Sequence, residues 1–371
     1  MRSITKLFHR RHAPDAVLSA ILGLLVVGGL VVLASASSHL GTTQFGDAYY
    51  YLKHQIAFGL SLGLVGFFVA SRLDYKIWKK LAFPLLLVSI GLLVAVFTPF
   101  GLEARNTNRW VALGPFSFQP AEILKITYIL YLGAWLSGAK KIRTQSIKTG
   151  LIPYVIVSGI IAGLLFMQPA TSTVMILLGS GLVVYFFSGV PFKYIAMIIG
   201  GGLLALTVLV AITPYRLQRI TSYIDGNSDT QGSGYHVNQA LIAIGSGGIT
   251  GVGWGKSTTK VSLLPAPVDD SIFAIAAQEL GFIGAGTIVV LFGALVMRLY
   301  LIAWKTKDAF GQLLLIGFGT VIAFQSLVNM MAISGLAPLT GVPLPFISYG
   351  GTALAIFMTM IGIASNVSAN N

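Results

Sequence analysis

The sequence predicts an all-α, polytopic membrane protein of about ten transmembrane helices with one long extracytoplasmic loop. Of the 371 residues, 55% are hydrophobic and only 9% are charged, whereas soluble domains carry about 25% charged residues. The hydrophobic residues gather in continuous runs, and a helix needs roughly 20 such residues to cross the hydrocarbon core. Continuous runs predict helices and exclude a transmembrane barrel, whose strands alternate.

The apolar runs are separated by short polar or glycine-rich segments, and we expect each run to form one spanning helix. The first run, at about 22 residues, is long for a signal peptide, so we interpret it as a retained helix. The runs lie near residues 16–37, 55–71, 81–99, 119–137, 151–167, 172–188, 194–213, 275–297, 309–333 and 350–366.

Basic residues set the expected orientation of these helices. Most of the 24 Lys and Arg residues fall in the segments 2–11, 72–80, 140–148 and 298–307, on one side of a ten-helix topology. Cytoplasmic loops carry such an excess, so both termini are expected in the cytoplasm. The net charge of +13 is then explained by topology and by anionic lipid, and no nucleic-acid partner is expected.

We treat residues 1–371 as a single membrane domain, with 1–15 as a cytoplasmic N-terminus and 214–270 as the large extracytoplasmic loop. Within that loop, residues 235–249 have helical apolar spacing and end in glycines, which predicts an amphipathic helix. The following Gly251–Ser257 looks like a phosphate-binding loop, but its spacing fits neither the Walker nor the dinucleotide pattern. A flexible glycine turn with one basic residue is the favoured interpretation.

Two adjacent carboxylates, Asp269 and Asp270, end this loop directly before an apolar run. The chain has only 11 acidic residues, so the doublet is conspicuous. Either could cap the helix that begins near Ser271. A cap needs one carboxylate, and a second charge beside it at a low-dielectric edge raises one pKa, as in a general base. Local chemistry leaves both roles open, as well as the choice between the two residues.

Three further ionisable residues lie inside apolar runs. Glu122 and Lys125 are three residues apart and share one face of a helix that starts at Gln119. They either serve a functional cavity or form an ion pair that only locks the bundle. Glu279 falls on the opposite side of an ideal helix from Asp270, so we expect it to pack against another helix. With no Cys and five scattered His, no dedicated metal site is expected beyond the Asp269–Asp270 pair.

In combination, these segments resemble the shape, elongation, division and sporulation (SEDS) proteins, the FtsW/RodA type of bacterial membrane glycosyltransferase. The resemblance covers about residues 16–366. It is carried by Arg109-Trp110, Phe118-Gln119-Pro120-Ala121-Glu122 with Lys125, Gln168-Pro169, Gly232-Ser233-Gly234-Tyr235 with Gln239, residues 243–248 and 251–253, Leu264-Pro265, Asp270 with Ile272-Phe273-Ala274, Glu279-Leu280-Gly281, residues 341–346, and Ser348-Tyr349-Gly350-Gly351.

The resemblance implies a ten-helix protein of the bacterial cytoplasmic membrane that polymerises lipid II, the undecaprenyl-pyrophosphate-linked disaccharide-peptide. It also implies contact with membrane lipid and with a class B penicillin-binding protein transpeptidase. Aligned on Ile272-Phe273, the family's essential Asp falls on Asp270, and Asp269 takes a Thr position. The division branch is favoured, because Gly255-Lys256-Ser257 stands where elongation members tend to have Gly-Thr-Gln.

The chain departs from the family pattern at several outer positions. The Glu and His that precede the essential Asp are Ala266 and Val268 here. The family's Gln-Pro-Asp turn ends in Ala170, and a basic position before the aromatic-Gln-Pro unit is Ser117. These losses put the substrate contacts in doubt while leaving catalysis open.

The resemblance implies an inverting mechanism in which Asp270 takes the proton of the acceptor's 4-hydroxyl. That oxygen attacks C1 of the donor and displaces undecaprenyl pyrophosphate, whose charge must be stabilised by cations. A divalent ion, Mg or Mn, could share this work. The alternatives are a lipid-precursor flippase that uses Glu122, Lys125 and Glu279 without chemistry, and a non-catalytic scaffold for a transpeptidase. The expected substrate-binding residues are Arg109, Gln119, Glu122, Lys125, Arg216, Arg219, Lys256, Lys260 and Ser348.

Overall fold

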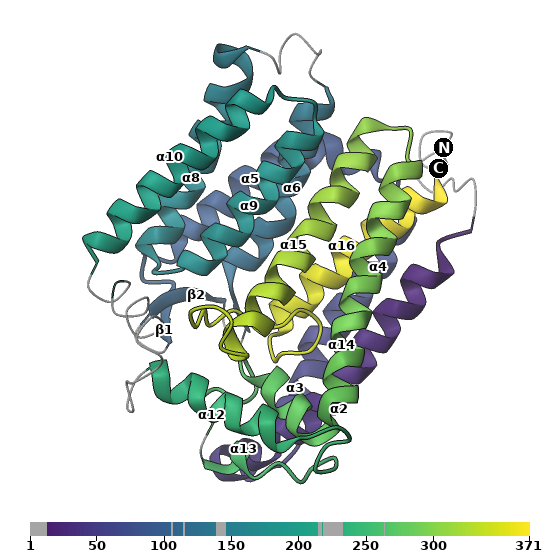
Figure 1. Ribbon diagram of the computed structural model, residues 1–371. Coiled ribbons are helices and arrows are strands. Elements are labelled where there is room, and N and C mark those ends of the chain that lie inside the picture. Colours follow the sequence, from purple (N-terminus) through teal and green to yellow (C-terminus); the bar gives the residue numbers. More distant parts are fainter. Residues whose placement is uncertain are drawn as a thin grey trace.

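Long apolar helices make up most of the computed structural model, and they run side by side in one bundle (Figure 1). The structure describes residues 13–104, 107–113, 116–138, 146–213, 217, 233–262 and 264–371. The bundle helices are α2 (Ala16–Phe45), α3 (Tyr50–His54) continued by η2 (Gln55–Leu60) and α4 (Ser61–Arg72), α5 (Lys76–Ala95), α6 (Pro120–Ser137), η3 (Ile147–Leu151) continued by α8 (Ile152–Met167), α9 (Thr171–Phe187), α10 (Phe192–Ala211), α14 (Ile272–Lys305), α15 (Ala309–Ile333) and α16 (Gly351–Ala369).

Every predicted apolar run is helical, but the predicted count of ten spans is not confirmed. Within the described residues, eight helices are long and apolar enough to cross a membrane. The two other predicted spans are α9, which has only 17 residues, and α6, which carries Glu122 and Lys125 near its start. The all-α, multi-pass membrane fold itself is confirmed.

Helix ends follow local capping chemistry. α15 (Ala309–Ile333) matches the predicted run 309–333, and its start is fixed by the Asp308 side chain, which accepts a hydrogen bond from the Gly311 amide at 3.0 Å. α2 runs past its predicted end at residue 37, through a Ser- and Thr-rich segment. There the hydroxyls of Ser38 and Thr42 donate to backbone carbonyls one turn earlier, which satisfies these polar groups within the helix.

Residues 100–118, between the predicted helices 81–99 and 119–137, contain a small antiparallel sheet that the sequence pattern did not predict. Its strands are β1 (Gly101–Ala104), β2 (Thr107–Leu113) and β3 (Phe116–Phe118), in the order β1-β2-β3. Val111 on the central strand is buried and pairs with Gly101 on one side and Phe118 on the other. The sheet leads directly into α6.

The two ends of the bundle carry different structures. The amphipathic helix predicted over 235–249 is confirmed as α12 (Ser233–Ser246), which lies with the short α13 (Thr259–Ser262) across one end (Figure 1). The opposite end holds the start of α2 and the end of α16. There Asp15 pairs with Arg298 of α14, and the Asn371 amide donates to the Thr306 hydroxyl at 2.9 Å. Which end faces the cytoplasm stays a prediction.

The Pro- and Gly-rich segment 334–350 enters the bundle. Phe346 and Ile347 are buried, and a Cβ built on Gly29, in the middle of α2, would lie 2.4 Å from the Phe346 carbonyl oxygen. Only glycine permits this approach. Irregular backbone is tolerated at membrane depth when protein surrounds it, and the Ser348 hydroxyl accepts the Leu344 amide at 2.8 Å.

Candidate active site

The acidic doublet lies at the start of α14, at the bundle end that carries α12. The capping position of α14 is Ser271, whose side chain makes no capping hydrogen bond. The Ser271 hydroxyl instead donates to the Pro265 carbonyl at 2.8 Å and lies within hydrogen-bond distance of His236 on α12. The residue at the N-cap of α14 is thus Ser271 and neither of the two aspartates.

Asn329 of α15 fixes the backbone of Asp270. Its side-chain amide donates to the carbonyl of Asp270 at 2.9 Å and to the carbonyl of Val342 at 2.7 Å. Asp270 is half-buried, and a Cβ built on Gly341 would lie 3.7 Å from its Oδ2 atom. The carboxyl group thus stands beside the segment 334–350, with its Oδ1 atom buried although the residue as a whole is half-buried.

The same segment holds the residues before Asp270. The Ser348 hydroxyl donates to the carbonyl of Asp269, and the Tyr349 amide donates to the carbonyl of Val268 at 2.9 Å. The Tyr349 hydroxyl lies 2.9 Å from Nδ1 of His54. Burial, two neighbouring tyrosines and Asp269 raise the pKa of Tyr349 to about 12.

A break divides α14 shortly after the doublet. Gly281 has φ 68° and ψ −167°, which are not helical angles. The glycine turn of residues 248–253 fills the gap by exchanging backbone hydrogen bonds with both sides of the break. These bonds run from Val252 to Gln278 (3.0 Å), Gly253 to Glu279 (3.1 Å), Phe282 to Gly248 (2.8 Å) and Ile283 to Ile249 (3.2 Å). The segment that resembles a phosphate-binding loop therefore completes a broken helix.

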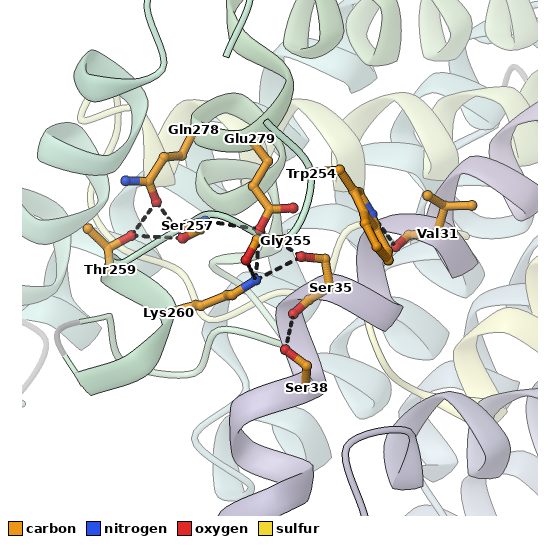
Figure 2. A network of polar contacts seen from close by, with 10 residues as sticks. All are labelled: Val31, Ser35, Ser38, Trp254, Gly255, Ser257, Thr259, Lys260, Gln278 and Glu279. Carbon is orange, nitrogen blue, oxygen red and sulfur yellow. Dashed lines mark hydrogen bonds and ion pairs between the residues drawn. The ribbon is translucent and has the colours of Figure 1, made fainter. Parts of the chain in front are cut away.

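Glu279 lies directly before the break, in a buried polar cluster (Figure 2). Its Oε1 atom accepts from the Ser35 hydroxyl of α2 at 2.7 Å and from the Lys260 ammonium of α13 at 2.8 Å. Lys260 also donates to Ser35 at 2.8 Å and to the Gly255 carbonyl at 3.0 Å. Glu279 is 3% exposed and Lys260 6%. Glu279 thus packs against another helix, as predicted.

Gln278, the neighbour of Glu279, makes further side-chain hydrogen bonds to the long loop of residues 214–270. Its Oε1 atom accepts from the hydroxyls of Ser257 and Thr259 (Figure 2). Its amide donates to the Ser246 hydroxyl at 2.9 Å. The end of this first part of α14 is therefore bonded through side chains to α12, to α13 and to the turn between them.

Glu122 and Lys125 form a second buried ion pair, elsewhere in the bundle. Their charged atoms lie 2.6 Å apart, and Lys125 also donates to Gln325 of α15 at 2.6 Å. The ammonium lies 5.4 Å from the centre of the Phe357 ring. Gln325 in turn donates to the Pro343 carbonyl at 2.9 Å. The pair joins α6 to α15 and, through Gln325, to the segment 334–350.

The other expected substrate-binding residues are dispersed. Arg109 on β2 donates to the carbonyls of Gln168 at 2.9 Å and Pro169 at 2.7 Å, in the turn between α8 and α9. Gln119 precedes α6 and makes no capping bond through its side chain. Lys256 is exposed and lies shortly after the glycine turn. Arg216 and Arg219 lie outside the described residues.

Sequence reasoning missed Ser35, Gln278, Gln325 and Asn329, which bind the acidic groups or their backbone. Each is an uncharged polar residue inside an apolar run. Polar side chains in membrane helices usually face the bundle interior and find partners there. That rule would have singled these residues out, although it could not have named their partners.

Two surface cavities lie away from the doublet. One of about 570 Å³ is lined by α4 residues, among them Phe68 and Arg72, and one of about 470 Å³ is lined by residues that include Phe187 and Trp304. A substrate pocket beside Asp270 remains a prediction. In the part of the chain that the structure describes, no three His, Cys, Asp or Glu side chains form a metal-binding group.

The fold and the acidic site define a multi-pass helical membrane protein with a carboxylate pair at the start of a broken helix. The chain belongs to the FtsW/RodA/SpoVE family of cell cycle proteins, whose family model matches residues 15–371. It is 37% identical over 359 residues to a probable peptidoglycan glycosyltransferase FtsW of Trichlorobacter lovleyi, covering 96% of this chain and 93% of the relative. It is 35% identical over 363 residues to stage V sporulation protein E of Bacillus subtilis, covering 97% and 98%.

Solved structures confirm the fold. A chain of a peptidoglycan synthase complex that coordinates polymerization and crosslinking superposes with a TM-score of 0.78 at 27% identity, covering 96% of this chain and 98% of that chain. The rod shape determining protein RodA of Thermus thermophilus superposes with a TM-score of 0.70 at 28% identity, covering 96% and 97%. The predicted family is therefore confirmed.

Proposed function

We propose that this protein is a peptidoglycan glycosyltransferase that polymerises lipid II into glycan strands, with Asp270 as its general base. The observation that carries the proposal is 37% identity over 96% of the chain to a relative named as a probable enzyme of this type. The fixed backbone and half-buried position of Asp270 support its role; its Oδ1 atom is buried, and its Oδ2 atom lies beside Gly341.

The chemistry asks for one base. Asp270 removes the proton of the acceptor's 4-hydroxyl, the freed oxygen bonds to C1 of the donor, and the bond from C1 to the pyrophosphate oxygen breaks. Undecaprenyl pyrophosphate leaves with the electron pair. A single displacement inverts C1 and forms no covalent enzyme intermediate. A base that is already held in place lowers the activation barrier, because less rotational and translational freedom has to be given up on reaching the transition state.

The leaving pyrophosphate needs positive charge. Lys256 is exposed shortly after the glycine turn and is free of the internal ion pairs that engage Lys260 and Lys125, so it is the described cation best suited to the task. Asp269 and Asp270 alone would fill only part of a divalent cation's oxygen shell. An ion such as Mg or Mn would be held jointly with the substrate's phosphates and would supply charge neutralisation.

The family suggests a cellular setting for the enzyme. We place it in the bacterial inner membrane with both termini in the cytoplasm and Asp270 at the outer face, as the distribution of Lys and Arg indicates. A class B penicillin-binding protein is the proposed partner, and the likeness to a chain of a peptidoglycan synthase complex supports it. Relatives named FtsW support the division branch.

An assay of product length tests the proposal against its alternatives. The purified protein would be mixed with labelled lipid II in detergent, with and without the partner, and the products separated on a gel. An enzyme lengthens glycan chains. A flippase moves lipid II from one leaflet of a vesicle membrane to the other and forms no glycan. A scaffold neither moves nor polymerises lipid II. The proposal predicts a ladder of glycan chains; lipid II that stays unpolymerised under both conditions contradicts it.

A further inference from the structure

The break at Gly281 leaves the first part of α14, residues 272–280, as a short half-helix about 13 Å long. Asp270 lies just before one end of it, and Glu279 lies at the other. The backbone bonds at the break go to residues 248–253, so the rest of α14 does not by itself fix the direction of the half-helix. Contacts around the half-helix, among them those at the Glu279 end, must do so.

Two side chains from other elements bind the Glu279 carboxylate. Ser35 belongs to α2, a helix of 30 residues, and Lys260 belongs to α13 in the long loop of residues 214–270. Both bind the same Oε1 atom of Glu279 and also bind each other, which closes a triangle (Figure 2). We call Ser35, Lys260 and Glu279 the clasp. Because its two charges are sealed from water, neither is stable there without the other.

We propose that the clasp is a positioning device for Asp270: it fixes the half-helix 272–280 against α2 and so sets where the Asp270 carboxylate stands. This inference rests on the proposed function of Asp270. Lys260 then acts through Glu279 as a positioning residue and does not bind the substrate's pyrophosphate. A fixed base matters because displacement of a reacting group by about 1 Å can cost a hundredfold in rate.

The chain supplies a matched control for this idea. Arg298 and Asp15 form another ion pair, 2.6 Å between Nη2 and Oδ2, which also joins α14 to α2. Arg298 lies beyond the break, at the opposite end of the bundle from Asp270. Loss of this pair removes a link between the same two helices but leaves the half-helix alone.

The test compares Lys260→Met, Glu279→Gln, the double variant, Lys260→Arg and Arg298→Met in lipid II polymerisation. We expect both single clasp variants to lower kcat roughly ten- to hundredfold with KM within about twofold of wild type. The double variant should be no slower than the slower single variant, because the two residues act as one unit. Lys260→Arg should recover part of kcat, and Arg298→Met should keep it.

Two kinetic results overturn the inference. If Lys260→Met raises KM at unchanged kcat while Glu279→Gln is silent, Lys260 binds substrate instead. If Arg298→Met lowers kcat as much as Lys260→Met, the clasp contributes only general stability.

Amide hydrogen exchange separates failure of this inference from failure of the proposed function. Exchange over residues 268–280 should quicken more in Lys260→Met than in Arg298→Met, whether or not the protein polymerises lipid II. Equal exchange in the two variants overturns the clasp on structural grounds alone. A wild-type protein without polymerase activity but with this exchange difference would disprove the proposed function and keep the clasp as the device that holds the half-helix.

Discussion

Gly251 and Gly281 meet backbone to backbone. A Cβ built on Gly281 would lie 2.3 Å from the Gly251 nitrogen, and one built on Gly251 would lie 2.1 Å from the Glu279 carbonyl oxygen. Both residues have positive φ, 84° and 68°. Only glycine allows the outer turn to enter the break in α14, so this contact joins the long loop to the half-helix that follows Asp270.

Replacing Gly281 with Ala should destabilise the protein. The new methyl group would meet backbone that cannot move aside, at a φ/ψ combination that only glycine adopts freely. We expect the free energy of unfolding to fall by about 2 kcal/mol or more, measured by thermal unfolding in detergent. Gly286→Ala is the control, because it lies in the same helix with open space around its Cβ. Equal stability of the two variants would contradict the contact.

Lys125→Met should be strongly destabilising, because it leaves Glu122 as a buried charge without its cation. The expected loss in unfolding free energy is about 3–5 kcal/mol. Adding Glu122→Gln to the same protein should restore part of it. The measurement is a double-mutant cycle on thermal unfolding. Additive losses would mean that the two side chains, 4% and 1% exposed, do not act as a pair.

Arg109 and Lys256 should respond differently to replacement by Ala. Arg109 binds two carbonyls of the turn between α8 and α9, so its loss should cost about 1–3 kcal/mol of stability. Lys256 is exposed, so its loss should leave stability unchanged within about 0.5 kcal/mol and raise KM for lipid II. Unfolding curves and steady-state kinetics on both variants check this, and a raised KM for Arg109→Ala alone would reverse the assignment.

Asp15 should make stability depend on acid pH. Burial acts to raise the pKa of Asp15, but hydrogen bonds from Arg298 and the Leu18 amide outweigh it and hold the pKa below the usual 3.8. The unfolded chain therefore binds this proton at a higher pH than the folded chain does. The stabilisation is complete above pH 3.8 and is lost as the pH falls through the lower folded value. Asp15→Asn should flatten this part of a plot of unfolding midpoint against pH; an unchanged slope would exclude Asp15 as its source.

Helices could be predicted from this sequence, because continuous apolar runs leave the backbone no other way to satisfy its hydrogen bonds in a membrane. The sheet of residues 101–118 was missed because its strands are short and gain stability only by pairing with each other. The break at Gly281 was missed for a related reason. One glycine within an apolar run gives no sign that a distant turn will occupy the gap.

The candidate site was predictable in part. The Asp269–Asp270 doublet stands out by composition, and the resemblance chose Asp270 between the two. The pairing of Lys260 with Glu279 was not predictable, since it depends on how the long loop folds back onto α2. Lys260 was therefore predicted as a cation for substrate, although the structure gives it an internal carboxylate.

The central claim, that Asp270 is the base, is tested most directly by comparing Asp270→Asn with Asp269→Asn in a lipid II polymerisation assay. Both variants remove one negative charge from neighbouring positions, so differences in folding and in surface charge are small. We predict that Asp270→Asn lowers the rate by about 10²- to 10⁴-fold while Asp269→Asn retains activity within tenfold of wild type. Wild-type rates for Asp270→Asn would contradict the account.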